Sequence, residues 1–364
     1  MITQFDPDRQ QLASLLDGEP SYRVDQVWQG LYTDLVDAGE ITTLPRALRE
    51  RLASELPTAL RPVTERTSDD GMTVKWLWAL ADGAEIETVL MHYPERSTVC
   101  ISTQAGCAMA CGFCATGQGG FERNLSTGEI VEQVVAATRR ARGDDRRVSN
   151  IVLMGMGEPL ANYDRTMEAV HRIHDALGLS ARHITVSTVG IVPGIRRLAD
   201  EALPINLAVS LHAADDELRD ELVPINRRYP IADLVTALEH YQGSHNRRLS
   251  FEWALIEDVN DRDIDAERLA VIATRLRAHV NLIPLNRTEG WPTRGSAPER
   301  VAAFRDLLVG LGVNATVRAN RGTDIDAACG QLRASRRDTG DPTVTVVDAP
   351  TRIERRRTSS DRTD

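Results

Sequence analysis

The amino-acid sequence predicts an α/β protein: a partial (β/α)6 TIM-type barrel, preceded by a small helical domain and a β-hairpin. Short β-branched runs alternate with amphipathic helical patterns, and each crossover helix brings the chain back so that the next strand runs parallel to the last. Polar residues follow the expected strands, at the edge where parallel sheets bind ligands. A doubly wound open sheet is the alternative arrangement of these units.

Residues 1–60 are expected to form a small helical accessory domain. Apolar residues recur three and four positions apart, which places them on one face of a helix. They are Val24, Val27, Trp28, Leu31, Tyr32, Leu35 and Val36. Core packing explains such a stripe, and a docking role for the domain is the second interpretation.

Residues 61–95 are expected to form the β-hairpin that leads into the main domain. Strand-like stretches cover 73–80 and 86–91, and the run Ala81-Asp82-Gly83 between them is a turn signal.

The main domain, 96–332, is expected to contain six strands and the helices that follow most of them. The predicted strands are 98–102, 150–155, 184–188, 205–211, 249–256 and 280–285. Helical patterns cover 127–142, 165–177, 231–241, 266–277 and 298–311. Residues 333–364 are rich in Arg, Asp and Thr, have no helical period, and are expected to be a disordered tail.

The composition argues against several protein classes. An odd number of cysteines, five, most of them clustered, and the absence of a charged-then-apolar leader argue against a secreted disulfide framework. No apolar run reaches the roughly 18 residues of a membrane helix, so we expect a soluble cytoplasmic protein. The net charge of -10 argues weakly against a nucleic-acid partner. Arginines nevertheless occur in local groups that would permit phosphate contact.

Three closely spaced cysteines are the strongest chemical signal in the chain: Cys107, Cys111 and Cys114. They lie in a Gly-rich loop after the first expected barrel strand, before a capping box formed by Ser126 and Glu129. Three thiolates can hold an iron-sulfur cluster that normally takes four protein ligands, which leaves one iron open. A structural zinc site is the main alternative, but it requires a fourth ligand and no His lies near in sequence. Inert buried cysteines are the third interpretation.

The spacing Cys-x3-Cys-x2-Cys after the first strand of a partial barrel resembles the radical S-adenosylmethionine (SAM) superfamily. The resemblance implies a 4Fe-4S cluster whose open iron binds SAM. The segment 154–159, with Gly157 and Glu158, resembles the superfamily's SAM-contacting segment after the second strand. Further strand-end positions resemble its contacts to the ribose and carboxylate of SAM; they are Ser187, Ser210, Leu211, His212 and Asn286. Each of these alone is more typical of a strand-end cap or turn.

Almost the whole chain, 22–332, is similar to the RlmN/Cfr family of RNA adenine methyltransferases. Beyond the cluster motif, the similarity rests on Glu87, Cys100, the run 22–32, and the run 321–332 that contains Cys329. The resemblance implies 2-methyladenine formation in 23S rRNA and tRNA. It also implies two SAM molecules per turnover, an electron donor such as flavodoxin, and a monomer.

The family resemblance gives roles to the remaining cysteines and to Glu87. An electrophilic amidine carbon of adenine cannot attack the methyl group of SAM directly. The resemblance implies that Cys329 carries the methyl group as S-methylcysteine, that Glu87 accepts a ring proton, and that Cys100 releases the RNA by transient disulfide formation with Cys329. Without the resemblance, Cys100 is typical of a core strand and Glu87 of a solvent-facing strand position.

Two alternative functions remain open at this point. Methylation at C8 of the same adenine, as in the resistance-conferring branch of the family, would use the same cysteines. A non-catalytic iron-sulfur or zinc RNA-binding module would leave Cys329 and Cys100 without a role.

Overall fold

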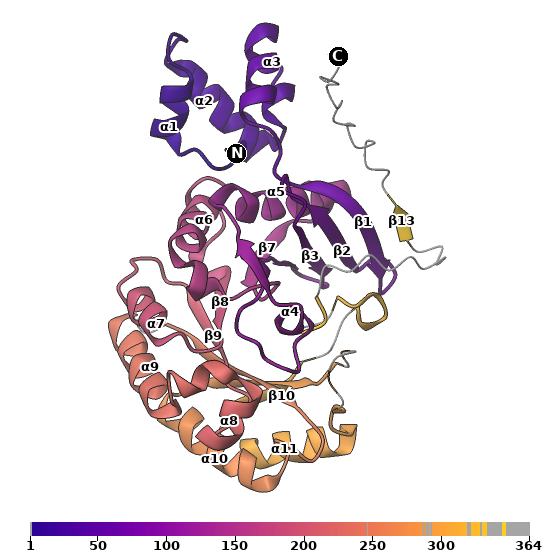
Figure 1. Ribbon diagram of the computed structural model, residues 1–364, viewed down its shortest axis with the longest axis vertical. Helices are drawn as coiled ribbons and strands as arrows, with labels where there is room; N and C mark the ends of the chain where they lie inside the picture. Colours follow the sequence, from indigo (N-terminus) through magenta and orange to yellow (C-terminus); the bar gives the residue numbers. More distant parts are fainter. Residues whose placement is uncertain are drawn as a thin grey trace, which may run out of the picture.

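The computed structural model describes residues 2–245, 247–286, 288, 291, 293–318, 322–327, 330–332 and 344–346. A curved sheet forms the main body, helices cover its outer face, and three N-terminal helices form a separate group at one end (Figure 1). The expected α/β class with a partial barrel is confirmed, because most of the sheet is parallel and its strands alternate with helices.

Seven parallel strands make up the barrel part of the sheet. They are β4 (Ser97–Cys100), β7 (Val148–Leu153), β8 (Ile184–Thr188), β9 (Asn206–Ser210), β10 (Leu249–Leu255), β11 (His279–Pro284) and β12 (Ala315–Val317). They neighbour one another in chain order. The six predicted strands are confirmed to within two residues at each end. The sequence did not predict β12, because three residues are too few to show a period.

Helices connect these strands and cover the outer face of the sheet. They are α5 (Thr127–Gly143), α6 (Tyr163–Asp175), α7 (Val192–Ala199), α8 (Asp216–Leu222), α9 (Ile231–His245), α10 (Asp263–Arg275) and α11 (Pro298–Gly310). The five predicted helices are present, with ends shifted by up to four residues. The two shortest, α7 and α8, were not predicted. The capping box at α5 is confirmed: the Ser126 hydroxyl accepts from the Glu129 amide, and the Glu129 carboxylate accepts from the Ser126 amide.

Short 3-10 helices complete the described connections. They are Ala38–Glu40, Pro159–Asn162, Ala181–His183, Pro224–Arg227 and Thr323–Ile325. Within the described part of the chain, no helix combines the length and apolar character needed to cross a bilayer.

An antiparallel extension continues the sheet beyond β4. It consists of β3 (Glu85–His92), β2 (Thr73–Ala79), β1 (Arg61–Ser68) and β13 (Val344–Val346). The predicted hairpin is therefore confirmed as β2 and β3, but β1 makes it three-stranded. The sequence analysis missed β1 because it is mostly polar and only partly buried. Pairing with β2, not hydrophobic alternation, makes it a strand.

The residues 333–364, expected to be a disordered tail, lie largely outside the described part of the chain. The described residues Val344–Val346 differ from that expectation, because they pair with β1 as the antiparallel strand β13.

A small two-stranded sheet frames the cysteine loop. It pairs β5 (Gln104–Gly106) with β6 (Phe121–Asn124), and the short helix α4 (Ala115–Gln118) lies between them in the chain. The Cys107 amide donates to the carbonyl of Gly120 at 2.7 Å, so the two ends of the loop are tied together. The loop therefore emerges directly from the end of the first barrel strand, as the sequence predicted.

The N-terminal helices are α1 (Arg9–Leu15), α2 (Tyr22–Gln29) and α3 (Arg46–Glu55), with a π-helical turn at Gly30–Asp34 after α2. Leu35 has a φ of 56°, which ends the helical stripe before Val36. Arg172 of α6 reaches into this group and is 7% exposed. Its guanidinium donates to the carbonyls of Phe5 (3.3 Å) and Pro7 (2.7 Å) and to the Tyr32 hydroxyl (3.0 Å). One buried cation thus fastens the helical domain to the barrel.

We predict that Arg172→Met weakens the docking of the N-terminal helices, because three hydrogen bonds from a buried charged donor are lost. The local unfolding free energy of α1 to α3, measured by native-state hydrogen exchange, should fall by about 3 kcal/mol. Arg165→Met, an exposed change on the same helix, is the matched control and should change it by less than about 0.5 kcal/mol. Equal protection in both variants would contradict the prediction.

Candidate active site

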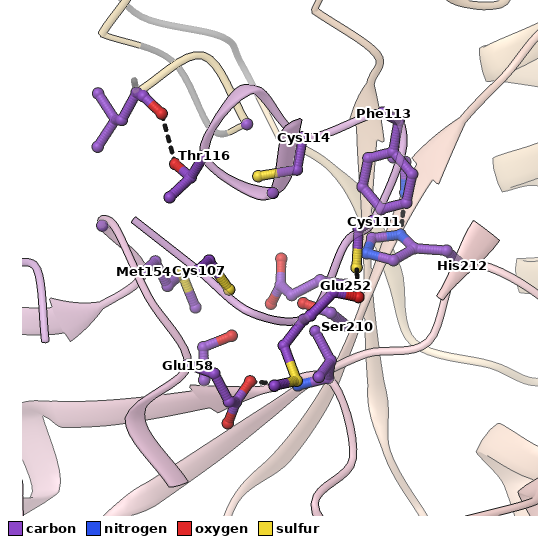
Figure 2. Close-up of a pocket in the computed structure, with 18 of the residues that line it drawn as sticks. Cys107, Cys111, Phe113, Cys114, Thr116, Met154, Glu158, Ser210, His212 and Glu252 are labelled. Carbon is purple, nitrogen blue, oxygen red and sulfur yellow. Dashed lines mark hydrogen bonds between the residues drawn. The ribbon is translucent and has the colours of Figure 1, made fainter. Parts of the chain in front are cut away.

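A pocket lies at the carboxyl ends of the parallel strands. Each strand from β7 to β11, or the residues just after it, contributes to the wall: Met154 after β7, Ser187, Ser210, Glu252, and Asn286 after β11. The cysteine loop closes the opposite side, and the cysteine sulfurs, Glu158 and Glu252 surround one space (Figure 2). The sequence predicted this edge of the sheet as the ligand site, and the pocket is found there.

Cys107, Cys111 and Cys114 all line the pocket, although they come from a loop and not from the sheet. The loop is held in shape by its backbone, since the Cys114 amide donates to the Cys111 carbonyl at 3.1 Å and Ala110 adopts a φ of 54°. None of the described cysteines forms a disulfide. The loop thus presents three free thiols to one space.

Burial controls the protonation of these thiols. It raises the pKa of Cys107 to about 12 and that of Cys111 well above its ordinary value. The guanidinium of Arg219 opposes this at Cys111, because a nearby positive charge favours the thiolate. Without a metal, both thiols therefore hold their protons near neutral pH. Metal binding would displace those protons, since thiolates are the ligands.

The three thiols fit a 4Fe-4S cluster with one open iron. They come from one loop, face one pocket, and lie beside the polar strand ends that a ligand of the fourth iron would contact. Among the described residues, no three Cys, His, Asp or Glu side chains are grouped as ligands of a single metal ion. Cluster cysteines are spaced more widely than zinc ligands, because each binds a different iron.

Two glycines shape the segment 154–159 that follows β7. The Gly155 amide donates to the Ile101 carbonyl at 3.0 Å, and a Cβ on Gly155 would lie 2.6 Å from that oxygen. Gly157 has a φ of 99°, and a Cβ on Gly157 would lie 2.5 Å from the Cβ of Gln104. Only glycine fits at either position without displacing the backbone. The segment is therefore packed tightly against the start of the cysteine loop.

Glu158 is 2% exposed and its carboxylate is held by backbone amides. It accepts from the Leu160 amide at 3.1 Å and from the Val189 amide at 2.9 Å. Burial raises the pKa of this carboxyl to about 7, and the amide hydrogen bonds oppose the rise. Its oxygens face the pocket beside Gly157, where the resemblance places the amino group of SAM. A cationic ligand would favour the ionised carboxylate.

The structure brings most of the other predicted SAM contacts to the pocket. Ser187, Ser210, His212 and Asn286 line it. His212 has a φ of 58°, and its ring nitrogen Nδ1 accepts from the Ala254 amide at 2.9 Å. Burial, with the charge of Arg219, lowers the His212 pKa to about 3, so the imidazole is neutral.

Leu211 differs from these residues. Its side chain is 1% exposed, packs in the main core, and is absent from the pocket lining. Its carbonyl already accepts from Nε of Arg219 at 3.1 Å. The Leu211 side chain therefore does not reach the pocket, and the expected contact from Leu211 to SAM stays a prediction.

Glu87 and Cys100 lie on neighbouring strands outside the lining of the main pocket. Cys100 of β4 pairs with Val89 of β3, two residues from Glu87, so all three side chains share one face of the sheet. Both predicted residues are buried, and Cys100 is 7% exposed. The expectation of a solvent-facing strand position for Glu87 without the family resemblance is thus wrong. Glu87 instead pairs with the Lys75 ammonium at 2.8 Å.

Cys329 and the residue before it lie outside the described residues, which end at Ala327 and resume at Gly330. Gly330 and Leu332 line the pocket with the cluster cysteines. The carbonyl of Gly330 accepts from the Ala115 amide at 2.8 Å, and the carbonyl of Leu332 accepts from the Thr116 hydroxyl (Figure 2). The start of α4, next to Cys114, therefore holds the chain that immediately follows Cys329.

Sequence reasoning missed three charged residues near the pocket. Glu252 of β10 and Arg318 both line it, and Glu252 is 3% exposed. Arg219 is fully buried beneath it and donates to the Val189 carbonyl at 2.6 Å and to Asn226 at 2.8 Å. Burial lowers the pKa of Arg219 to about 10. The alternation of strand-like and helical segments predicted β10 as a strand. The sequence contained no signal that distinguishes these three buried or pocket-lining charged residues from charged residues on the surface.

Comparison with known proteins identifies the family. Residues 101–270 match the Radical SAM superfamily. A probable dual-specificity RNA methyltransferase RlmN from Frankia alni is 53% identical over 340 residues, covering 90% of this chain and 81% of the relative. One of the same name from Chloroflexus aurantiacus is 52% identical, covering 90% and 92%.

A solved structure supports the same assignment. The crystal structure of a radical SAM methyltransferase from Sphaerobacter thermophilus superposes with a TM-score of 0.90 at 51% identity, covering 92% of this chain and all of that one. The superfamily implies a 4Fe-4S cluster and SAM. The family resemblance predicted from sequence is confirmed: this chain belongs to the RlmN family of radical SAM RNA methyltransferases.

Proposed function

We propose that this enzyme forms 2-methyladenine in 23S rRNA and in tRNA, through an S-methylcysteine on Cys329 and a covalent protein-RNA adduct. The observation that carries the proposal is that α4 ties the chain following Cys329 to the cysteine loop, so that Gly330 and the three cluster cysteines line one pocket. The name shared by the relatives, dual-specificity RNA methyltransferase, supports two kinds of RNA substrate.

Cys329 has the central role because adenine cannot take the methyl group directly. Cys107, Cys111 and Cys114 would hold the 4Fe-4S cluster, whose chemistry would be the reductive cleavage of SAM to a 5'-deoxyadenosyl radical. The Cys329 thiolate attacks the methyl carbon of one SAM molecule, S-adenosylhomocysteine leaves, and Cys329 becomes S-methylcysteine. A second SAM molecule is consumed to remove one hydrogen atom from that methyl group. The methyl carbon can then bond to the adenine ring. The RNA is then tethered to Cys329.

Glu87 and Cys100 complete the reaction in this proposal. Glu87 accepts the ring proton, a role that suits a carboxylate in a closed site. The Cys100 thiolate attacks the Cys329 sulfur, the sulfur-carbon bond breaks, and a disulfide forms. The released carbon takes a proton, and the unpaired electron left from the radical addition passes back to the redox partner that supplied it, which completes the product methyl group. The shared sheet face of Glu87 and Cys100 supports a joint role in release.

The remaining assignments are part of the same proposal. Residues 1–60 form an RNA-docking domain, 61–95 link it to the barrel, and 96–332 form the catalytic domain. The target adenine must leave the base stack, because a stacked helix hides its C2 edge. We further propose that the enzyme acts as a monomer and takes electrons from a donor such as flavodoxin.

Isotope transfer tests the route of the methyl group. Reduced, cluster-loaded enzyme is incubated with RNA and SAM that carries a trideuterated methyl group. We expect a product methyl with two deuterium atoms, because one is lost as the hydrogen atom. Mass spectrometry of RNA digests measures this and separates 2-methyladenine from the C8 isomer. Retention of all three deuterium atoms would mean direct transfer, and a C8 product would show the alternative regiochemistry.

Cysteine variants test the two sulfur roles. Cys329→Ala should abolish RNA methylation while keeping the iron content of the wild type. Cys100→Ala should accumulate RNA cross-linked to protein, visible as a protein band that shifts on ribonuclease treatment. Cys107→Ala is the control that should lose iron and all activity together. If Cys100→Ala gives no cross-link, Cys100 has no part in release.

A further inference from the structure

Lys75 is the only lysine in the chain, and it is buried beside Glu87. Every other basic side chain apart from histidine is an arginine, and most of these lie at least partly exposed. The Lys75 side chain is 8% exposed and that of Glu87 is 3% exposed. A buried ion pair is costly to form unless hydrogen bonds satisfy its remaining atoms. The burial of Lys75 beside Glu87 therefore needs a structural or chemical explanation.

The ammonium of Lys75 has three proton donors, and three acceptors surround it. They are Oε1 of Glu87 at 2.8 Å, the carbonyl of Asp326 at 2.9 Å and the carbonyl of Ile325 at 3.3 Å. The first of these hydrogen-bond acceptors is the carboxylate of Glu87, the residue proposed to take the ring proton. The other two belong to the backbone only three and four residues before Cys329.

Other contacts hold the same segment, 322–327, against the strands β1 and β2. The Ser68 hydroxyl donates to the Asp324 carboxylate. Gly322 has a φ of 61°, and a Cβ there would lie 2.9 Å from Thr73 and 2.8 Å from Ala327. These contacts bring the segment to the sheet. The Lys75 ammonium differs from these groups because it binds both the segment and Glu87.

The strand register aligns the site. Lys75 of β2 is opposite Arg66 of β1 and Val89 of β3, and Val89 is opposite Cys100 of β4. Directly paired residues point to the same face, so Arg66, Lys75, Glu87 and Cys100 share the face against which the segment 322–327 lies. A small cavity beside the ammonium is lined by Thr64, Arg66, Leu77, Glu87 and Asp326. Arg66 and Asp326 are its other charged groups.

An arginine could not make the same contacts. Its planar guanidinium forms side-by-side hydrogen bonds in a fixed fork, whereas an ammonium directs three bonds around one nitrogen. The acceptors here belong to a side chain of β3 and to two consecutive carbonyls of another segment, so they surround a point. This geometry accounts for lysine in a chain that uses arginine everywhere else.

We propose that Lys75 is a positioning residue that joins the Glu87 carboxylate to the backbone leading to Cys329, so that one ammonium sets the proton acceptor and the methyl-carrying segment relative to each other. The inference rests on the proposed roles of Glu87 and Cys329. The physical link between Lys75 and the segment 322–327 is testable without them.

Hydrogen exchange on RNA-free, cluster-loaded enzyme tests the link. Lys75→Met keeps the length of the side chain but removes all three donors, so amide exchange in 322–327 should rise at least about tenfold. Arg61→Met, an exposed change on the same three-stranded unit, is the control and should leave it unchanged. Unchanged exchange in Lys75→Met overturns the proposal, whatever the enzyme's activity on RNA.

A pH profile tests the effect of Lys75 on Glu87. If Lys75 had only a structural role, its loss would not move the midpoint of this profile. RNA release from the covalent adduct is followed against pH. Without its ammonium partner a buried carboxylate keeps its proton to higher pH, so the acid side of the profile should move up by about one pH unit in Lys75→Met. Arg66 remains and limits the shift. Lys75→Arg should keep the wild-type midpoint at a reduced rate, because the charge is retained. An unmoved midpoint in Lys75→Met overturns the proposal.

Thermal unfolding keeps the proposal testable if Lys75→Met folds poorly. Glu87→Gln combined with Lys75→Met removes both charges, so the double variant should have a higher Tm than Lys75→Met alone. If the two substitutions lower the Tm additively, the link between Lys75 and Glu87 through their ion pair is overturned. If the wild type fails to methylate RNA, the proposed function fails, while the hydrogen exchange and Tm results still decide the role of Lys75.

Discussion

The site depends on the close approach of two strand ends, those of β4 and β7. The Gly155 amide bonds to the carbonyl of Ile101, and the Met156 carbonyl accepts from the amides of Thr103 and Gln104. A side chain at Gly155 would separate the two backbones. These hydrogen bonds join the start of the cysteine loop to the segment that carries Glu158. Because parallel neighbours end at the same edge, one pairing places the three loop cysteines and the segment 154–159 in one pocket.

Buried charge is the second constraint, and each buried charged group near the pocket has a partner that accounts for it. Glu158 accepts from two backbone amides, and Arg219 donates to the carbonyls of Leu211 and Val189. Glu87 and Lys75 pair with each other. Such groups are expensive to bury alone and are retained where their orientation matters. The hydrogen bonds that offset the cost come from backbone groups at several strand ends, so these strand ends and the buried charges hold one another in place.

Most of the fold was predictable because it repeats. Six strands and five helices follow the same alternation, and Ser126 with Glu129 marks the start of α5. Short or polar elements were not predictable: β12 has three residues, α7 and α8 have two turns, and β1 owes its form to pairing with β2.

The sequence by itself identified the candidate chemical groups: three thiols in one loop, two further cysteines, and polar residues after consecutive strands. It did so because ligand type and spacing along a loop are local properties. Only the tertiary structure decided which of these groups share a space. It placed Glu87 and Cys100 on one face, gave Glu87 a buried lysine as partner, and brought the chain after Cys329 to the start of α4. The last of these contacts joins residues more than 200 positions apart, as in the bond from Thr116 to Leu332, and the other two depend on strand register, so no local pattern records them.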